Sequence, residues 1–258
     1  MPTISVVIPS RNDAPMLAAC LDALKLQTRR PDEVVVVDNG STDDTAAVCS
    51  AAGVRRLFLA VPGIAGATAA GFDAATGNLL ARLDADSVPP PDWVARVEEI
   101  LVAQGPMTAV TGPGDFYGGN RLTRWIGENI YIAGYIHVVG ALLGHPPLFG
   151  SNFGMSAAMW AQLRPLVHRD LHQVHDDLDL SYQIRPWMSV LYDPTLRVGV
   201  SARPFDSWSG LKRRLVMAWQ TFDLDFRNES PRTRRRARRL ARMRPGGITP
   251  PPDQPAEA

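Results

Sequence analysis

Short runs of β-branched and other apolar residues alternate with helix-like patterns through the first half of this chain. The runs expected to form strands lie at residues 4–8, 34–37, 54–59, 79–83 and 108–111. Between them, the spacing of apolar positions predicts helices near 14–26, up to about 52, near 65–75 and near 92–103. Because strand–helix alternation is typical of a mostly parallel sheet with helices on both faces, we expect an α/β fold.

The pattern becomes less regular after residue 111. Residues 112–120 are rich in glycine and are expected to form a loop, and short strands are expected near 149–156, 190–192 and 196–200. Helices are expected at 177–184 and in a last amphipathic segment with an apolar stripe of Leu211, Leu215, Trp219, Phe222 and Phe226. The apolar run at 130–143 would span only about 21 Å as a helix, short of the ~30 Å of a bilayer core, so no transmembrane helix is predicted.

Charge is distributed unevenly, although the net charge of the 258 residues is only +1. Residues 227–258 hold nine arginines against three acidic residues and end in a proline-rich stretch. We therefore expect one domain at 1–226 and a disordered basic tail at 227–258. The cluster from Arg232 to Arg244 can dock onto anionic lipid headgroups or stay solvated, and both interpretations remain open. No aromatic residues are interleaved with these arginines, so no nucleic-acid partner is expected.

The N-terminus and the two cysteines indicate the compartment. The first nine residues lack a basic region and resemble a strand rather than a signal peptide. Cys20 and Cys49 follow no metal or redox spacing and are expected to be small buried residues in a reducing environment. We therefore expect a cytoplasmic protein, with peripheral contact to the cytoplasmic membrane face left open by the basic tail.

Polar clusters follow three of the expected strands. They are Ser10-Arg11-Asn12-Asp13, Asp38-Asn39-Gly40-Ser41 and Asp84-Ala85-Asp86-Ser87. Because ligands bind beyond the carboxyl ends of parallel strands, we expect these clusters to share one rim of the sheet. Asp84 and Asp86 can hold a hard divalent cation that neutralises a diphosphate, although an isolated Asp-x-Asp is more often a solvated turn.

In combination, five segments resemble glycosyltransferase family 2 in their order and spacing. They are VVIPSRN at 6–12, VVDNGSTD at 36–43, LDAD at 83–86, GSNFGMS at 150–156 and HDDLDL at 175–180. The resemblance covers about residues 3–205 and implies a GT-A fold, a Rossmann-like and mostly parallel sheet flanked by helices. It also implies inverting transfer from a nucleoside-diphosphate sugar, with Mg²⁺ or Mn²⁺ as cofactor. Residues 1–111 would form the nucleotide-sugar-binding half and residues 112–226 the acceptor-binding half. A UDP-sugar is the favoured donor, with GDP- and dTDP-sugars also open.

The same resemblance assigns the nucleotide pocket. Asp38 is expected to bind the base, and the same pocket is expected to be lined by Pro9, Arg11 and Asn12. An Asx turn before Gly40 is the alternative role of Asp38, and one side chain can do both.

Further along, the resemblance assigns the diphosphate and metal positions. Asp84 is expected to contact the ribose or the water shell of the metal, with Ala85 beside it, and Asp86 to bind the ion itself. The additional histidine ligand of some relatives has no counterpart at 198–203, so Asp86, the diphosphate and water would hold the ion. Gly71 falls where the family has a glycine near the donor. The two common polar residues before it are replaced by threonine at 68 and alanine at 69, which puts direct contact from this helix in doubt.

On the acceptor side, Ser151 and Asn152 match the family's acceptor strand, and Asp177 matches its catalytic base. An inverting transfer needs a carboxylate to take the proton of the acceptor hydroxyl. The neighbouring Asp176 is expected to raise the proton affinity of Asp177 by like-charge repulsion. The structural alternative is an aspartate-rich first helical turn that complements the helix dipole. Three nearby histidines are expected to be solvated, namely His168, His172 and His175.

The expected function is therefore that of an inverting glycosyltransferase acting on an acceptor glycan or lipid-linked sugar, in cell-envelope or lipid-linked glycan synthesis. Two alternatives remain. A catalytically silent sugar-nucleotide-binding scaffold would explain the departures at 68 and 69. A sugar nucleotidyltransferase would be expected to carry a glycine-rich loop near the N-terminus, and residues 9–12 contain no glycine.

Overall fold

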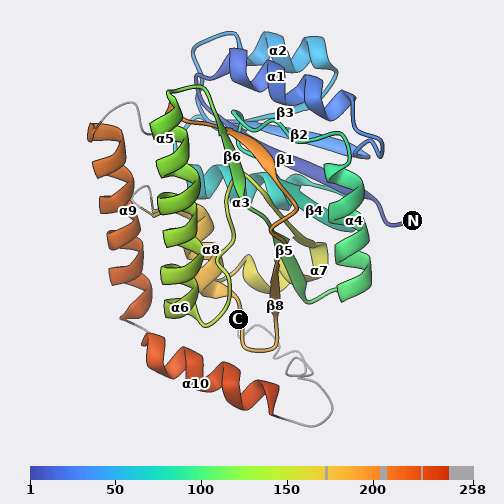
Figure 1. The fold of residues 1–258 in the computed structure, drawn as a ribbon. Helices are drawn as coiled ribbons and strands as arrows, with labels where there is room; N and C mark the ends of the chain where they lie inside the picture. The colour runs from blue at the N-terminus through green and yellow to red at the C-terminus, as the bar shows by residue number, and fades with distance from the viewer. Residues whose placement is uncertain (172–173, 204–207, 228, 244–258) are drawn as a thin grey trace.

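The structure is a computed structural model that describes residues 1–171, 174–203, 208–227 and 229–243 (Figure 1). Its strands are β1 (Ile4–Ser10), β2 (Glu33–Asp38), β3 (Arg55–Phe58), β4 (Leu79–Arg82), β5 (Thr108–Thr111), β6 (Gly114–Tyr117), β7 (Phe153–Ser156), β8 (Ser189–Tyr192) and β9 (Val198–Ser201). Its helices are α1 (Ala14–Lys25), α2 (Thr45–Ala52), α3 (Ile64–Ala74), α4 (Trp93–Gln104), α5 (Arg121–Ile126), α6 (Gly140–Leu143), α7 (Ala157–Leu163), α8 (Asp176–Gln183), α9 (Trp208–Phe226) and α10 (Pro231–Arg242).

The central sheet has seven strands in the order β3-β2-β1-β4-β7-β5-β8. All its pairings are parallel except those of β7, which runs antiparallel between β4 and β5. The alternating β-branched runs therefore predicted the α/β fold correctly. Because β1, β2 and β4 are parallel neighbours, the segments that follow them leave the sheet at the same rim.

Apolar residues cover both faces of this sheet. On one face, α1 and α4 pack through residues such as Leu17, Leu21 and Trp93. On the other, α3, α7 and α8 pack through residues such as Phe72 and Met159. Each face of the sheet is thus buried, as the near-continuous apolar composition of the central strands requires.

One expectation for the second half was wrong. Residues 112–120 do not form a simple loop, because β6 pairs in parallel with β9 in a second, two-stranded sheet. The apolar run at 130–143 lies in one long helical stretch in which π-helical turns, Gly127–Ile132 and Tyr135–Val139, connect α5 to α6 (Figure 1). No helix among the described residues is long and apolar enough to cross a membrane.

The last amphipathic helix is present as α9, but its predicted stripe is only partly correct. Phe222 and Phe226 stack with their ring centroids 5.3 Å apart and pack against Tyr182 of α8. Trp219, however, is 68% exposed, so it does not belong to the packed face. The side chains of Leu211 and Leu215 lie outside the described residues.

The expectation of a disordered tail was wrong for residues 231–242, which form α10. Ser230 caps this helix by accepting a hydrogen bond from the backbone N–H of Thr233. Arg234 and Arg238 turn inward and donate hydrogen bonds to backbone carbonyls of residues 182, 184 and 188. These carbonyls lie at and beyond the end of α8, where a helix leaves acceptors unsatisfied and its dipole favours cations. Residues 244–258 of the predicted tail lie outside the described part.

Candidate active site

A cleft of about 670 Å³ opens at the rim where β1 and β4 end. Its walls come from the segments after these strands, from the start of α8 and from the segment after β9. Of the sequence-predicted residues, those that line it are Pro9, Arg11, Asp84, Ala85, Asp86, Asp176 and Asp177. Most of the predicted donor, metal and catalytic positions therefore meet in one cavity, as the strand-end argument required.

The two carboxylates that follow β4 have different environments. Asp84 accepts hydrogen bonds from Arg82 at 2.8 Å and from the Ser151 hydroxyl at 2.6 Å, so each of its oxygens has a partner. Asp86 has Arg203 as its ion-pair partner, at a longer 3.5 Å. Burial, with the nearby charge of Asp84, raises the pKa of Asp86 to about 6. A partly buried carboxylate whose ionised form is disfavoured by burial and by a neighbouring negative charge is suited to bind a cation.

Asp177 is held rigidly at the start of α8. The backbone N–H of Gly150 donates to its Oδ2 at 2.8 Å, and Nδ1 of His175 lies 2.6 Å from its Oδ1. Asp176, by contrast, contacts side chains of α3 and β4. It accepts from the Thr68 hydroxyl at 2.7 Å and pairs with Arg82 at 3.0 Å. Thr68, one of the two residues in α3 that depart from the family pattern, therefore connects α3 to α8.

The pKa of Asp177 is lowered overall, whereas the neighbouring charge of Asp176 was expected to leave it raised. Burial favours a raised pKa at both groups. At Asp177 this effect is exceeded by the charge and hydrogen bond of His175, by Arg82 and by the Gly150 amide, so its pKa is lowered. At Asp176, burial and the neighbouring Asp177 exceed the effect of Arg82, and the pKa is raised. Asp177 is consequently ionised at neutral pH.

Sequence reasoning missed Arg82 and Arg203, and it wrongly expected His175 to be solvated, since its Nδ1 lies 2.6 Å from Asp177. Arg82 is a fully buried arginine in the otherwise apolar strand β4, and it lies between Asp84 and Asp176. Its position inside an apolar run was a usable signal, because a charge is rarely buried unless it is paired. Arg203 binds Asp13 at 2.6 Å and closes the cleft from the segment after β9. No local pattern marks that residue.

Asp38 and Asn12 lie near the rim but serve the loops around it. Asp38 forms the Asx turn that was its alternative role, since its Oδ1 accepts the backbone N–H of Ser41 at 2.9 Å. Its Oδ2 pairs with Arg56 at 2.6 Å. Asn12 accepts the backbone N–H of Thr42 at 2.7 Å and thus joins the loops after β1 and β2. Neither residue lines the cleft.

Gly71 and Asn152 were also expected at the site, and the structure gives both a packing role. A Cβ at Gly71 would lie 2.3 Å from Cγ1 of Val7, so the glycine permits α3 to approach the sheet. Asn152 is fully buried and holds Trp93 through its Oδ1 at 2.8 Å. Its amide nitrogen donates to the carbonyls of residues 113 and 196. It therefore fixes the loops behind the site rather than facing an acceptor.

An aromatic recess adjoins the cleft and shares Asp84, Asp86 and Asp177 with it. Its apolar walls are Phe116, Tyr131, Tyr135 and Phe149. Ser151, the other predicted acceptor-side residue, also lines this recess. The apolar helix and the β6–β9 sheet thus form a second compartment beside the carboxylates.

Solved glycosyltransferases share this architecture. A mannosyltransferase from Pyrobaculum calidifontis, solved in complex with GDP-Man and Mn²⁺, aligns over 92% of this chain and 68% of its own, with a TM-score of 0.65 and 22% identity. The glucosyl-3-phosphoglycerate synthase of Mycobacterium tuberculosis, solved in complex with uridine diphosphate, aligns over 88% of this chain and 79% of its own. Its TM-score is 0.61 and its identity 21%. Such similarities establish the GT-A fold.

Sequence comparison then shows the family. Residues 5–169 match glycosyl transferase family 2, and the chain belongs to that family. It is 36% identical over 118 residues to a PGL/p-HBAD biosynthesis glycosyltransferase of Mycobacterium bovis, which covers 43% of this chain and 46% of that protein. The chain spans less than half the length of the first curated relatives it matches.

Proposed function

We propose that the protein transfers a sugar from a nucleoside-diphosphate sugar to an acceptor hydroxyl, with inversion at the anomeric carbon. The observation that carries this proposal is the placement of Asp177. It is a buried, ionised carboxylate fixed by Gly150 and His175, and it borders the same cleft as the acidic pair Asp84 and Asp86. A base and a cation-binding group thus lie on one cavity.

Asp86 is the residue proposed to hold a divalent ion. Its carboxylate is a hard oxygen ligand, and burial beside Asp84 raises its pKa, so a cation would relieve the charge there. Mg²⁺ and Mn²⁺ both suit a site with one protein carboxylate and the remaining ligands from phosphate and water. When bound, the ion supplies positive charge to the departing diphosphate. Mn²⁺ accompanies GDP-Man in the Pyrobaculum mannosyltransferase, which supports this choice.

Asp177 is proposed to act as the base. It takes the proton of the acceptor hydroxyl while the hydroxyl oxygen bonds to the anomeric carbon, and the bond from that carbon to the diphosphate breaks. A single displacement of this kind inverts the anomeric configuration. His175 and the Gly150 amide keep the carboxylate oriented and ionised, so that it can accept the proton when the hydroxyl becomes acidic during bond formation.

The aromatic recess is proposed to receive the acceptor. Phe116 and Phe149 offer apolar surface, while Tyr131 and Tyr135 add polar tips, and this combination suits a glycan or a lipid-linked sugar. The donor is proposed to be a UDP-sugar, with GDP- and dTDP-sugars as the other candidates. Uridine diphosphate in the mycobacterial synthase supports the first choice and GDP-Man in the Pyrobaculum enzyme the second.

The exposed face of α10 supports a position at the cytoplasmic face of a membrane. The side chains on this face, spaced by helical periodicity, are Arg232, Arg235, Arg236, Arg239, Leu240 and Met243. Each arginine near an anionic lipid surface contributes about 1 kcal/mol. We propose that this face docks on anionic headgroups and brings the recess to a lipid-linked acceptor.

The decisive variant is Asp177→Asn. Asparagine keeps the size of aspartate but does not take a proton at neutral pH, so turnover with a competent donor and acceptor should fall by about 10²–10⁴-fold. Donor affinity, measured by calorimetry with Mn²⁺, should change little. Asp176→Asn is the matched control and should cost less turnover, because its carboxylate bonds Thr68 and Arg82 inside the protein. Normal turnover in both variants would refute the proposed mechanism.

The metal assignment has its own test. Donor affinity should fall strongly in EDTA, because the diphosphate would otherwise face Asp84 and Asp86 without a counter-ion. Asp86→Asn should lower donor affinity at a Mn²⁺ concentration that saturates the wild-type protein, and EDTA should lower it little further. Donor binding that is equally tight in EDTA would remove the ion from the proposal.

A further inference from the structure

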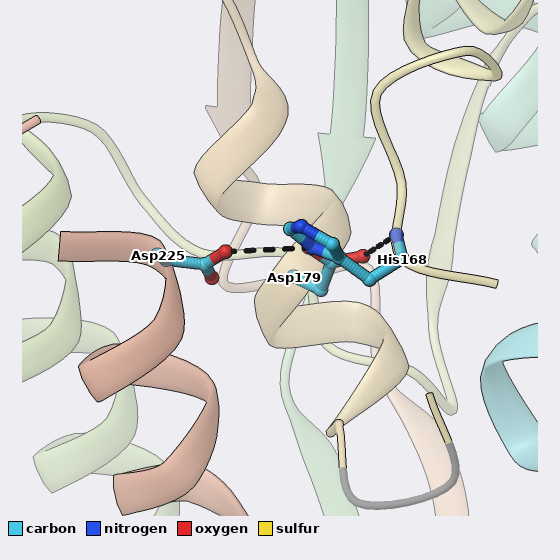
Figure 2. A group of neighbouring side chains, drawn as sticks. All are labelled: His168, Asp179 and Asp225. Carbon is cyan, nitrogen blue, oxygen red and sulfur yellow. Dashed lines mark hydrogen bonds and ion pairs between the residues drawn. The ribbon is translucent and has the colours of Figure 1, made fainter. Parts of the chain in front are cut away.

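A second cluster of ionisable side chains lies outside the cleft, where α9 packs against α8 (Figure 2). Asp225 comes from α9, Asp179 from α8, and His168 from the segment after α7. Both aspartates are buried, whereas the His168 side chain is 29% exposed. One ligand atom from each residue lies within 4.8 Å of the others. Nothing in the proposed transfer reaction uses these three groups.

The unusual member of the cluster is Asp225. It is 0% exposed, and neither of its carboxylate oxygens has a hydrogen-bond partner among the described residues. A buried carboxylate without donors is costly, because the protein replaces none of the water that it loses. Figure 2 shows Asp225 directed toward the imidazole of His168, and the distance from its Oδ1 to Nδ1 is 3.7 Å.

The other two members are already oriented for binding. The backbone N–H of His168 donates to Oδ2 of Asp179 at 2.8 Å, and this bond fixes the segment against α8. The ring Nδ1 of His168 lies 2.8 Å from Oδ1 of Asp179. Gln183, one turn further along α8, donates to the same Oδ1 at 3.1 Å and steadies that carboxylate. A second interaction that orients a ligand is characteristic of metal sites.

The distances suit a small divalent ion. With bonds of about 2.0–2.2 Å, two ligand atoms of a tetrahedral zinc site are separated by roughly 3.3–3.6 Å. The Nδ1–Oδ1 distances of 2.8 and 3.7 Å, to Asp179 and Asp225, bracket this range, so small side-chain rotations suffice. Charge agrees as well, since two carboxylates and a neutral imidazole balance a dication. The exposed edge of His168 leaves an approach for the ion and for water as a further ligand.

We propose that His168, Asp179 and Asp225 form a structural site for a divalent transition-metal ion, of which Zn²⁺ is the type. One imidazole and two carboxylates are ligands that Zn²⁺ accepts, and the imidazole disfavours Mg²⁺ and Ca²⁺. The ion would join α9 to α8 at a point where a buried carboxylate without hydrogen-bond donors among the described residues lies beside the hydrogen-bonded pair of His168 and Asp179.

An ion at this site would also strengthen the support that α9 gives to α8, the helix that carries the proposed catalytic base. α8 begins with Asp176 and Asp177, and the hydroxyl of Thr221 in α9 accepts the backbone N–H of His175 immediately before them. α9 therefore supports the start of α8 through one hydrogen bond and would support its middle through the ion. Both contacts to α8 come from the same part of α9, since Thr221 and Asp225 are one turn apart.

The test is zinc binding by the full chain after stripping with EDTA and dialysis. Wild-type protein should bind one more equivalent of Zn²⁺ than Asp225→Asn, as measured by calorimetry and by metal analysis after gel filtration. At about 100-fold excess of free Zn²⁺ over its Kd, the wild-type Tm should rise by roughly 5–10 °C. His168→Gln should lose the same equivalent, and because this side chain is partly exposed, the variant should fold even if Asp225→Asn does not.

Two control variants separate this site from others. His137→Gln alters another histidine, whose Nδ1 lies 2.7 Å from the backbone carbonyl of residue 133, and this variant should retain the zinc. Asp86→Asn should also retain it, so loss of the active-site ion is distinguishable from loss of this one. Zinc stoichiometry and a Tm rise in Asp225→Asn or His168→Gln equal to those of wild-type protein would overturn the proposal, as would wild-type protein that binds no Zn²⁺.

Discussion

Replacing Gly71 with alanine tests whether this residue serves packing between α3 and the sheet or contact with the donor. The added Cβ would lie 2.3 Å from Cγ1 of Val7 and 2.8 Å from Cγ2 of Val37. Both valines are fully buried in adjacent central strands, β1 and β2, so they have little room to move. The helix α3 must therefore shift away from the sheet.

The size of the effect follows from two opposing contributions. Overpacking a well-packed core costs typically 1–3 kcal/mol, while alanine is better than glycine in a helix by roughly 0.5–1 kcal/mol. We expect a net loss of about 1–2 kcal/mol, which for a chain of this size lowers Tm by roughly 2–8 °C. Because Thr68 lies on the same helix and bonds Asp176, turnover should also fall, whereas donor affinity should change little.

The assay is thermal unfolding with parallel donor titrations. Gly134→Ala is the matched control, since this helical glycine has nothing within 4 Å of an added Cβ and its φ of −59° suits alanine. That variant should be neutral or slightly more stable. A Gly71→Ala protein with unchanged Tm and a selective loss of donor affinity would refute the packing argument and restore the donor-side role.

Acidification should destabilise the protein through His145, whose pKa is lowered to about 3 by burial and then by Arg238. The pKa of histidine in the unfolded chain is about 6.5, so the stability that comes from burying neutral His145 is fully present above pH 6.5. It is lost as the pH falls toward 3, at up to roughly 1.4 kcal/mol per pH unit. In denaturant titrations, wild-type protein should lose more stability between pH 7 and 5 than His145→Gln, and equal losses would contradict the assignment. Deleting residues 229–258 should lower Tm by about 4 °C or more, since the carbonyls of Ile184 and Met188 lose their arginine donors. Deleting 244–258 alone is the control, and an unchanged Tm in the longer deletion would show that α10 adds no stability. Glutamine at the exposed positions 232, 235, 236 and 239 should preserve Tm and abolish co-sedimentation with anionic vesicles, whereas retained binding would remove the membrane role from α10.

The parallel sheet was predictable because its signal is local. Each central strand is a short β-branched run, and each following polar cluster leaves the sheet at its carboxyl end, so residues such as Asp84 and Asp86 could be placed at one rim from spacing alone. The π-helical turns and the pairing of β6 with β9 were not predictable in this way. Residue 114 pairs with residue 198, and no periodicity within either segment reports that partner.

The tail shows where composition misleads. Few apolar residues and many arginines predict disorder, because such a segment cannot bury enough apolar surface to offset its ordering. α10 is held instead by polar contacts, in which Arg234 lies over the ring of Tyr182 at 4.1 Å and bonds the carbonyls beyond α8. Those acceptors exist only once α8 has formed and ended, so the information that orders the tail lies 50 residues earlier in the chain.

The charge balance of the cleft could not be predicted either, and it decides which aspartate does what. By charge and position alone, Asp176 and Asp177 are equivalent neighbours at the start of one helix, and only the resemblance to the family distinguishes them. The structure breaks this equivalence because Arg82 reaches Asp176 from β4, while His175 and the Gly150 amide reach Asp177. Arg82 also pairs with Asp84, whereas the ion-pair partner of Asp86 among the described residues is Arg203, at 3.5 Å. A single buried arginine thus pairs with Asp84 and Asp176, which leaves Asp177 as the proposed base and Asp86 as the proposed cation ligand.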